Sequence, residues 1–170
     1  MRHDVQQVLM RLATATMSVL ELEGMRYADP GERNVVSELF VRLRAEFPDW
    51  DVSNEYDRRE QVKKRLAYDN PATGAMLEAD ITPDIIVHRI GVRENLLVVE
   101  VKRHVNTDME RDIWKLSGMT AARGAYGYAI GVHLILNIPA GIVVECNVYI
   151  DGAIDIAHTT WLRERLPSST

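Results

Sequence analysis

The sequence predicts a single α/β domain in which helices flank a mixed β-sheet. Helical periodicity dominates the first 47 residues, a β-hairpin occupies the middle of the chain, and a capped helix separates this hairpin from two further strands. Parallel strands need a long crossover connection, which is usually a helix. This order therefore predicts a sheet that contains both parallel and antiparallel pairs. At 170 residues the chain suits one domain over 1–170.

Two helices are predicted before the first strand. Apolar residues recur at helical spacing over residues 4–23, and Gly24 is the expected C-cap. The stretch Tyr27–Arg33 is rich in turn-forming residues and separates this helix from the next. The second helix is expected over Asn34–Phe47, with Asn34 as its N-cap and Pro48 after its end. The helix over 4–23 either packs on the domain or forms a homodimer contact, and its sequence does not decide between the two.

Glu38 lies beside the apolar stripe of the second helix. The 3.6-residue period places it about 60° outside the edge of that stripe. One explanation is an i,i+4 pair with Arg42, which is worth only ~0.3–0.5 kcal/mol. The other is a role at a functional site next to the helix.

A charged segment follows the predicted helices. Asp51–Asp57 is expected as a first strand, and Arg58–Met76 is a charged stretch, helical in part, that ends in a Pro/Gly turn. It begins with a cluster of basic residues that is either a solvated surface or a local rim for an anionic substrate. The cluster consists of Arg58, Arg59, Lys63, Lys64 and Arg65.

The central hairpin carries charge where a core strand should be apolar. Its two runs are Asp84–Ile90 and Leu96–Lys102, joined by the polar link Gly91–Asn95. The second run begins apolar on both faces, as a buried strand does. Because side chains alternate along a strand, Glu100 and Lys102 share one face.

The register of this hairpin decides which charges meet. If Ile90 pairs with Leu96, then Asp84 lies opposite Lys102 and Ile86 opposite Glu100. Two carboxylates and an ammonium group then converge at one end of the hairpin. A bulge in the link would place Asp84 on the other face.

The remaining elements complete the sheet and the C-terminal region. The segment Thr107-Asp-Met-Glu110 is a capping box, so a helix is expected from Asp108 to about Arg123. Tyr126–Asn137 and Gly141–Asp151 are expected as buried strands joined by a short turn. Trp161–Leu166 is expected as a short helix in a C-terminal extension over 152–170.

The charges of the hairpin suit a hard divalent cation and a phosphodiester. Mg²⁺ binds oxygen ligands from one or two carboxylates and keeps several waters. Asp84, Glu100 and the backbone carbonyl of Val101 are the candidate ligands. A bound metal ion lowers the pKa of its water and stabilises negative charge on a phosphate. Lys102 is the candidate to orient that water or to neutralise the transition state. The alternative is that these residues form a structural cross-strand ionic cluster at a solvent-exposed edge of the sheet. Charges beside a buried strand are costly to desolvate, and this counts against the alternative.

At these residues the sequence resembles the PD-(D/E)XK nuclease superfamily, which has the restriction-endonuclease-like fold. Pro83-Asp84 matches the PD element and Glu100-Val101-Lys102 matches the (D/E)XK element. The resemblance covers roughly 34–151 and implies an α-β-β-β-α-β core, to which the helix over 4–23 is an N-terminal addition. It further implies that Glu38, on the helix before the sheet, contributes a metal ligand, and that Lys115, on the helix after the motif, contacts phosphate.

The resemblance implies an endonuclease or related phosphodiesterase, with Mg²⁺ or Mn²⁺ as cofactor and DNA favoured over RNA as substrate. The alternative function is a catalytically inactive binding or assembly module with the same fold, which the net charge of −5 favours. A third is a dimeric structural protein joined through residues 4–23. No apolar run approaches the ~20 residues of a membrane span, and the first residues are too polar for a signal peptide. With Cys146 as the only cysteine, a cytoplasmic protein is expected.

Overall fold

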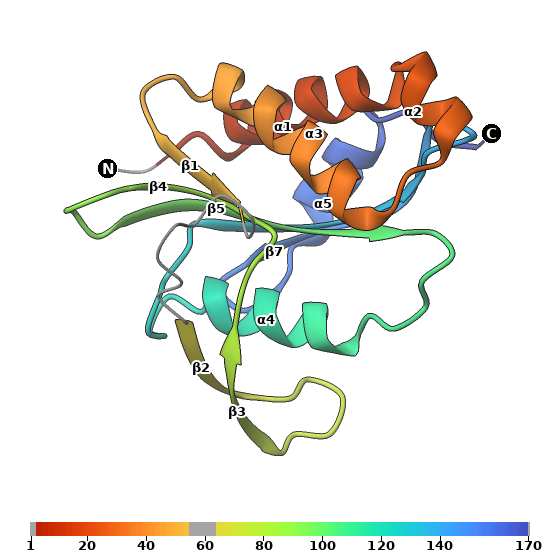
Figure 1. Ribbon diagram of the computed structural model, residues 1–170. Helices are drawn as coiled ribbons and strands as arrows, with labels where there is room; N and C mark the ends of the chain where they lie inside the picture. Colours follow the sequence, from red (N-terminus) through yellow and green to blue (C-terminus); the bar gives the residue numbers. More distant parts are fainter. Residues whose placement is uncertain (1–2, 55–63, 170) are drawn as a thin grey trace.

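A mixed β-sheet separates two layers of the molecule in the computed structural model (Figure 1). The structure describes residues 3–54 and 64–169. The strands of this sheet, in spatial order, are β1 (Asp51–Asn54), β4 (Ile85–Arg89), β5 (Glu94–Arg103), β6 (Ile130–Asn137), β7 (Ile142–Ile150) and β8 (Ala153–Ile154). Only β5 and β6 pair in parallel among these neighbours, and α4 (Glu110–Thr120) forms the crossover between them. The prediction of an α/β domain with a mixed sheet is confirmed.

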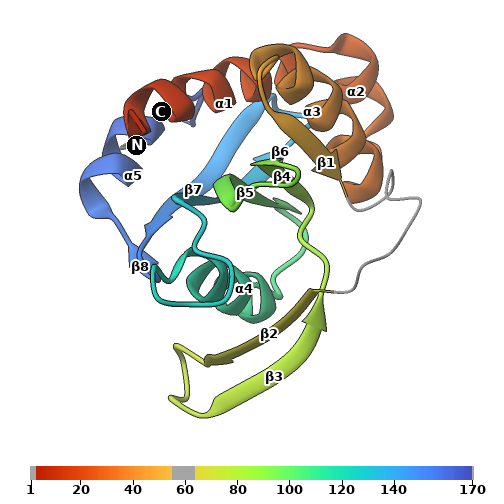
Figure 2. The same ribbon diagram turned by 90° about the vertical axis from the view of Figure 1, so that its left-hand side faces the viewer.

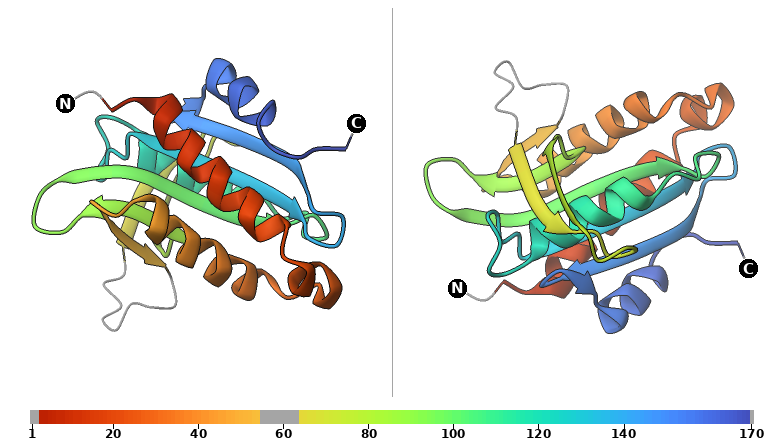
Figure 3. Two further views of the ribbon diagram at one scale, coloured as in Figure 1. Left: turned by 90° about the horizontal axis from the view of Figure 1, so that it is seen from above. Right: turned by 90° about the horizontal axis from the view of Figure 1, so that it is seen from below.

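One face of the sheet is covered by α1 (Val5–Leu20), α3 (Glu32–Glu46) and α5 (Ile156–Arg163), with α2 (Glu23–Ala28) beyond α1 (Figure 3, left). The other face is covered by α4 and a two-stranded sheet of β2 (Lys64–Asp69) and β3 (Met76–Ile81) (Figure 3, right). Alternation along β5 divides its side chains between two cores. Val99 and Val101 belong to the core beneath the helices, and Val98 belongs to the core beneath α4.

Helix α1 packs on the domain itself. Its buried residues include Leu9, Leu12 and Val19, and they join the same core as the apolar face of α3. Asp4 caps its first turn by accepting a hydrogen bond from the Gln7 N–H. The apolar face of α1 therefore packs on its own domain, which is the first of the two alternatives that the sequence left open. Within the described ranges no helix has both the length and the apolar character that crossing a membrane requires.

Several predicted helix ends are wrong by a few residues. The first helix ends at Leu20, and Gly24 lies inside α2 rather than capping α1. Helix α3 begins at Glu32, with Gly31 rather than Asn34 as its N-cap. The predicted capping box at Thr107 does not form. Helix α4 begins at Glu110, because the Asn106 side chain holds the Asp108 N–H in a turn before the helix starts.

The hairpin of β2 and β3 was not predicted. It projects beyond α4, which lies between this hairpin and the main sheet (Figure 2). Leu66 and Ile81 face α4 and are buried, whereas Arg65 and Glu78 pair on the exposed side. Lys64 donates a hydrogen bond to the Tyr128 hydroxyl at 3.0 Å, so it is tied to the domain. The other basic residues of the predicted rim, Arg58, Arg59 and Lys63, lie outside the described residues.

The register of the central hairpin differs from the expected one by two residues near its open end. Ile86 pairs with Val98 rather than with Glu100, and a bulge follows between Val87 and His88. Because two residues is an even displacement, it leaves each side chain on its expected face. Continued one pair further, this register places Asp84 opposite Glu100 instead of Lys102.

Candidate active site at the open end of the central hairpin

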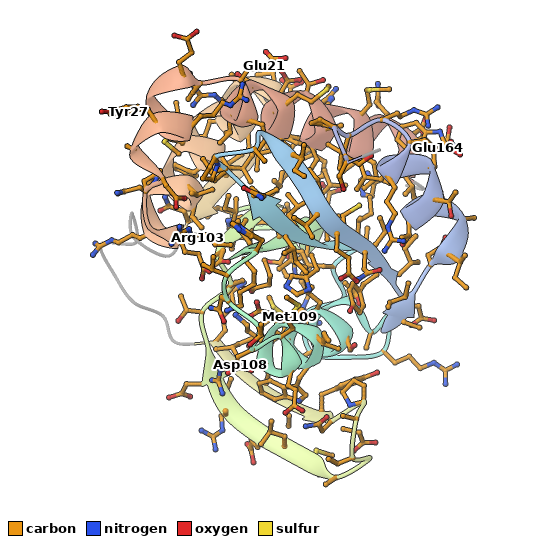
Figure 4. All side chains as sticks on the ribbon, turned by 90° about the vertical axis from the view of Figure 1, so that its right-hand side faces the viewer. Glu21, Tyr27, Arg103, Asp108, Met109 and Glu164 are labelled. Carbon is orange, nitrogen blue, oxygen red and sulfur yellow. The ribbon has the colours of Figure 1, made fainter. Side chains whose placement is uncertain are left out.

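A polar pocket of about 350 Å³ lies where the open end of the hairpin meets α3 and α4. In Figure 4, Arg103 marks the end of β5 while Asp108 and Met109 precede α4, so the segments that border the pocket are seen together. The residues that line it are Glu32, Asp80, Thr82, Asp84, Glu100, Lys102, Asp108, Arg111, Asp112 and Lys115. Four residues predicted from sequence are therefore in one place: Asp84, Glu100, Lys102 and Lys115.

Asp84 is held against β5 by a backbone contact. Its Oδ2 accepts a hydrogen bond from the Val101 N–H at 2.8 Å, which fixes the carboxylate beside the motif strand. Burial raises the pKa of Asp84 from 3.8 to about 6, although the Val101 N–H and the charge of Lys115 oppose this rise. The contact that the Val101 backbone makes with Asp84 is through its amide, and the role of its carbonyl as a metal ligand stays a prediction.

Glu100 is the most deeply buried charged group of the pocket, with 1% of its side chain exposed. Its Oε2 accepts a hydrogen bond from Lys115 Nζ at 2.7 Å, whereas its Oε1 has no hydrogen-bond partner among the described residues. Burial and the nearby charge of Asp84 raise the pKa of Glu100 well above its ordinary value. A wholly buried carboxylate oxygen without a partner is costly, so it marks a place where an additional cation or donor would be stabilising.

Lys102 extends from the same face of β5 as Glu100, but its ammonium group lies against other carboxylates. Its Nζ is 3.4 Å from Asp112 Oδ2 and 3.9 Å from Glu32 Oε1. Burial by itself lowers the pKa of Lys102, but the charges of these two carboxylates outweigh it and raise the pKa. Lys102 therefore stays charged and faces the pocket.

Asp112 on α4 is a contact point for both lysines. Its Oδ1 is 3.3 Å from Lys115 Nζ, and its Oδ2 is 3.4 Å from Lys102 Nζ and from His133 Nε2. Burial would raise the pKa of Asp112, but the close contact with His133 and the charges of Lys115 and Lys102 lower it overall. The pKa of Lys115 is raised because Glu100 and Asp112 outweigh the effect of burial.

Glu38 is not brought to this pocket. Its Oε2 is 2.6 Å from Arg42 Nη1 in an i,i+4 pair, and 43% of its side chain is exposed. Arg42 is held in turn by a hydrogen bond to Ser18 of α1. The acidic residue that α3 does contribute to the pocket is Glu32, in the first turn of the helix. Glu32 is absent from the predicted site because the pattern of Tyr27–Arg33 predicts a turn, whereas the helix begins at Glu32, two residues earlier than predicted.

His133 is a second residue that the sequence analysis did not place. It lies on β6 directly beside Glu100 and is buried. A histidine within the otherwise apolar run Gly131–Leu136 was the available signal, since a buried imidazole needs a polar partner. His88, by contrast, lies near Ser53 of β1, with Nε2 3.4 Å from the hydroxyl oxygen.

The donor set of the pocket fits a hard cation in part. Over residues 3–54 and 64–169, no group of three or more His, Cys, Asp or Glu side chains is arranged to hold a metal ion unaided. Mg²⁺, however, is usually held by one or two carboxylates together with waters and substrate oxygens. Asp84 and Glu100, with the unpartnered Glu100 Oε1 between strand and helix, supply ligands of this type.

Together, the fold and the site define an α/β protein with a mixed six-stranded sheet and a buried ionic cluster at the open end of its central hairpin. No protein-family model, curated protein or solved structure matches the chain.

Proposed function

We propose that the protein is a metal-dependent nuclease that hydrolyses phosphodiester bonds with Mg²⁺ or Mn²⁺, with DNA as the favoured substrate. The observation that carries the proposal is Glu100. It is a buried carboxylate with one oxygen bound to Lys115 and the other without a partner, beside the carboxylate of Asp84. Buried charges of this kind are expensive for stability, and they are typical of sites that bind a charged ligand.

The order of the elements supports a restriction-endonuclease-like core. Without the β2–β3 hairpin, the chain from α3 onward runs α3, β1, β4, β5, α4, β6. This is the α-β-β-β-α-β order that the resemblance implies, and the hairpin is then an insertion between the first two core strands. Asp84 precedes the second core strand, and Glu100 and Lys102 lie near the end of the third.

The charges of the pocket support the need for a cation. Among the described residues, six carboxylates line it against three cationic side chains, which are Lys102, Arg111 and Lys115. A phosphodiester would be repelled by this surplus unless a divalent cation reduced it. Asp84 and Glu100 would hold the ion, with the Val101 carbonyl as a further ligand. When bound, the ion would supply an activated water and stabilise charge on the phosphate.

The lysines of the pocket have two further roles, which are to neutralise charge on the phosphate and to orient a metal ligand. Lys102 has a raised pKa and faces the pocket, so it neutralises negative charge that develops on the reacting phosphate. Lys115 binds Glu100 Oε2 and so orients this carboxylate. The role of phosphate contact, expected for Lys115 from the resemblance, fits Arg111 better, because Lys115 is 9% exposed and already contacts two carboxylates.

The alternative is a catalytically inactive module that binds or assembles with nucleic acid. One observation favours it: both lysines of the pocket are already paired with carboxylates, so the cluster is partly neutralised without a metal ion. RNA contains the same phosphodiester and is a substrate of the same chemistry.

Cleavage of supercoiled plasmid and of labelled single-stranded DNA and RNA, with Mg²⁺ or Mn²⁺, tests the proposal. We expect Asp84→Asn and Lys102→Met to reduce cleavage by on the order of 10²–10³-fold or more, because each removes a group that acts on transition-state charge. Glu38→Gln is the matched control, since its surface pair with Arg42 lies outside the pocket, and it should retain activity. Substrate binding without metal-dependent cleavage would favour the inactive module instead.

A further inference from the structure

Four buried side chains form a continuous polar chain from β6 through α4 to β5. His133 Nε2 lies 3.4 Å from Asp112 Oδ2, Asp112 Oδ1 lies 3.3 Å from Lys115 Nζ, and Lys115 Nζ lies 2.7 Å from Glu100 Oε2. Each of these side chains is at most 9% exposed. These contacts connect His133 with Glu100. His133 has no role in the proposed chemistry, whereas the proposal depends on Glu100.

We propose that Asp112 and His133 are positioning residues that set the orientation of Glu100 through Lys115. This inference rests on the proposed function, because the purpose of the arrangement is to leave Glu100 Oε1 available for a divalent cation. Lys115 occupies only Oε2, and Oε1 is left without a partner. Ligating carboxylates in metal sites are generally held by such outer hydrogen bonds, which fix the direction of the ligand atom.

The position of Lys115 requires Asp112. A lysine side chain has four rotatable carbons and loses substantial conformational entropy when it is fixed in one place. Lys115 and Asp112 are three residues apart on α4, so they lie on the same face of the helix. Asp112 therefore holds the ammonium group from one side while Glu100 binds it from the other.

The position of Asp112 in turn requires His133. The two side chains come from different elements, α4 and β6, and His133 is paired directly with Glu100 across the parallel strands. His133 Nε2 and Asp112 Oδ2 lie 3.4 Å apart, and neither has a hydrogen-bond partner among the described residues, so the two groups are in close polar contact without the geometry of a hydrogen bond. This contact places the imidazole, on the strand beside the motif strand, against the helix carboxylate, and a shift of α4 along the sheet would separate the two.

Asp112 also connects the two lysines of the site. Its Oδ2 lies 3.4 Å from Lys102 Nζ, so one carboxylate sets the separation between the lysine that orients Glu100 and the lysine that faces the substrate. A group that served only to balance charge could lie anywhere near the cluster. The placement of Asp112, with one oxygen toward Lys115 and the other toward Lys102 and His133, is that of a positioning group.

The test is the affinity of the 170-residue chain for Mn²⁺ alone, measured by titration calorimetry at constant pH for wild type and three variants. His133→Leu removes the imidazole that contacts Asp112, whereas glutamine would keep an N–H donor near the place of Nε2. Asp112→Asn removes the carboxylate charge that lies between Lys115 and His133. Asp108→Asn is the charge-matched control, because Asp108 lines the same pocket on its exposed side and is not one of the four side chains in the chain.

We expect His133→Leu and Asp112→Asn to weaken Mn²⁺ binding by on the order of 10–100-fold, the usual effect of removing a polar group that supports a metal ligand from outside. Asp108→Asn should weaken it by only a few-fold. Circular dichroism establishes that each variant is folded, and His133→Leu alone decides the question if Asp112→Asn does not fold.

The outcomes separate the inference from the function on which it rests. If wild type binds Mn²⁺ and His133→Leu binds it equally well, the positioning role is wrong and the proposed metal site stands. If Asp112→Asn and Asp108→Asn weaken binding to the same extent, Asp112 contributes charge alone and the inference also fails. If wild type binds no Mn²⁺, the proposed metal site is wrong, and the inference, which depends on that site, is wrong as well.

Discussion

At the scale of single residues, the pocket brings together charges that an apolar core would exclude. Asp84, Glu100 and Asp112 are three carboxylates in a poorly hydrated environment, and only part of their charge is balanced by Lys102 and Lys115. Each charge removed from water costs free energy that its partners only partly restore. The strongest conflicts between local preference and structure are expected where a protein performs its function.

The burial of Asp84 should make the free energy of unfolding depend on pH. Its pKa is about 6 in the folded protein and 3.8 ordinarily, so between these values the folded protein retains a proton that the unfolded chain has lost. The stabilising contribution of the protonated group is full below pH 3.8 and is lost as the pH rises through 6. Asp84→Asn cannot ionise. We therefore expect its stability relative to wild type to increase between pH 4 and pH 7.5, by roughly 2–3 kcal/mol.

Urea unfolding in EDTA at several pH values measures this difference. Asp155→Asn is a control with the opposite sign. The hydrogen bond from the His158 N–H at the start of α5 lowers the pKa of Asp155, so its carboxylate stabilises the fold above pH 3.8 and that stability is lost as the pH falls. The Asp155 variant should therefore lose stability relative to wild type as the pH rises. Parallel pH profiles for wild type and Asp84→Asn would show that Asp84 is not desolvated.

The sequence predicted much of the pocket but not its outer residues. Asp84, Glu100 and Lys102 could be placed together because strand alternation and a hairpin are short-range rules. The placement of Lys115 came from the resemblance, and the structure brings it to the same pocket. Their catalytic roles stay predictions. Glu32 and His133 were missed because they come from a helix end and a strand whose approach to the hairpin depends on tertiary packing.

At the scale of elements, α4 approaches the sheet closely at a glycine. A Cβ added at Gly131 of β6 would lie 2.8 Å from Thr120 Cγ2 and 3.2 Å from Leu116 Cδ2, both on α4, and 3.3 Å from Tyr149 Cβ on β7. This contact sets the distance between the helix that bears Asp112 and Lys115 and the strands beneath it. The absence of a side chain at residue 131 is therefore a structural requirement of the site.

We expect Gly131→Ala to destabilise the protein by about 1–3 kcal/mol, because the added methyl group forces α4 away from a packed sheet. Gly24→Ala is the matched control. Gly24 lies in α2 with no atom within 4 Å of an added Cβ, so alanine there should be neutral or stabilising by up to about 0.5–1 kcal/mol. Chemical denaturation of both variants measures the two effects. If Gly131→Ala and wild type unfolded at the same denaturant concentration, α4 would be able to move away from the sheet without a cost in stability, and the prediction would be wrong.

Element predictions succeeded where the pattern was long and failed where it was interrupted. The helices over 4–23 and 34–47 and the strands near 130 and 145 have continuous apolar periodicity, and each was found within a few residues. The β2–β3 hairpin was missed because only its inward face is apolar. Leu66 and Ile81 pack on α4, whereas Arg65, Glu78 and Asp80 on the outer face made the segment resemble a charged loop.

At the scale of the whole molecule, the sheet separates the layer of α1, α3 and α5 from the layer of α4 and the β2–β3 hairpin (Figure 1). The larger core lies between the sheet and helices α1, α3 and α5, and none of the charged residues of the pocket belongs to it. The larger core and the buried charge of Glu100 thus lie on opposite faces of the same strands, and the face with Glu100 also carries the smaller core under α4. Val99 and Val101 face the larger core, while Glu100 between them faces the pocket.

This division predicts how the protein responds to a defect in α1. Leu12 is wholly buried between α1 and the rest of the domain, so Leu12→Ala should cost about 2–5 kcal/mol through lost burial and a cavity. Because Leu12 packs within its own chain, the unfolding midpoints of wild type and variant should differ by the same amount at every protein concentration. If α1 instead held two chains together, both midpoints would rise with concentration. Thermal unfolding over a hundredfold range of concentration, with Met10→Ala on the exposed side of α1 as the control, distinguishes the two.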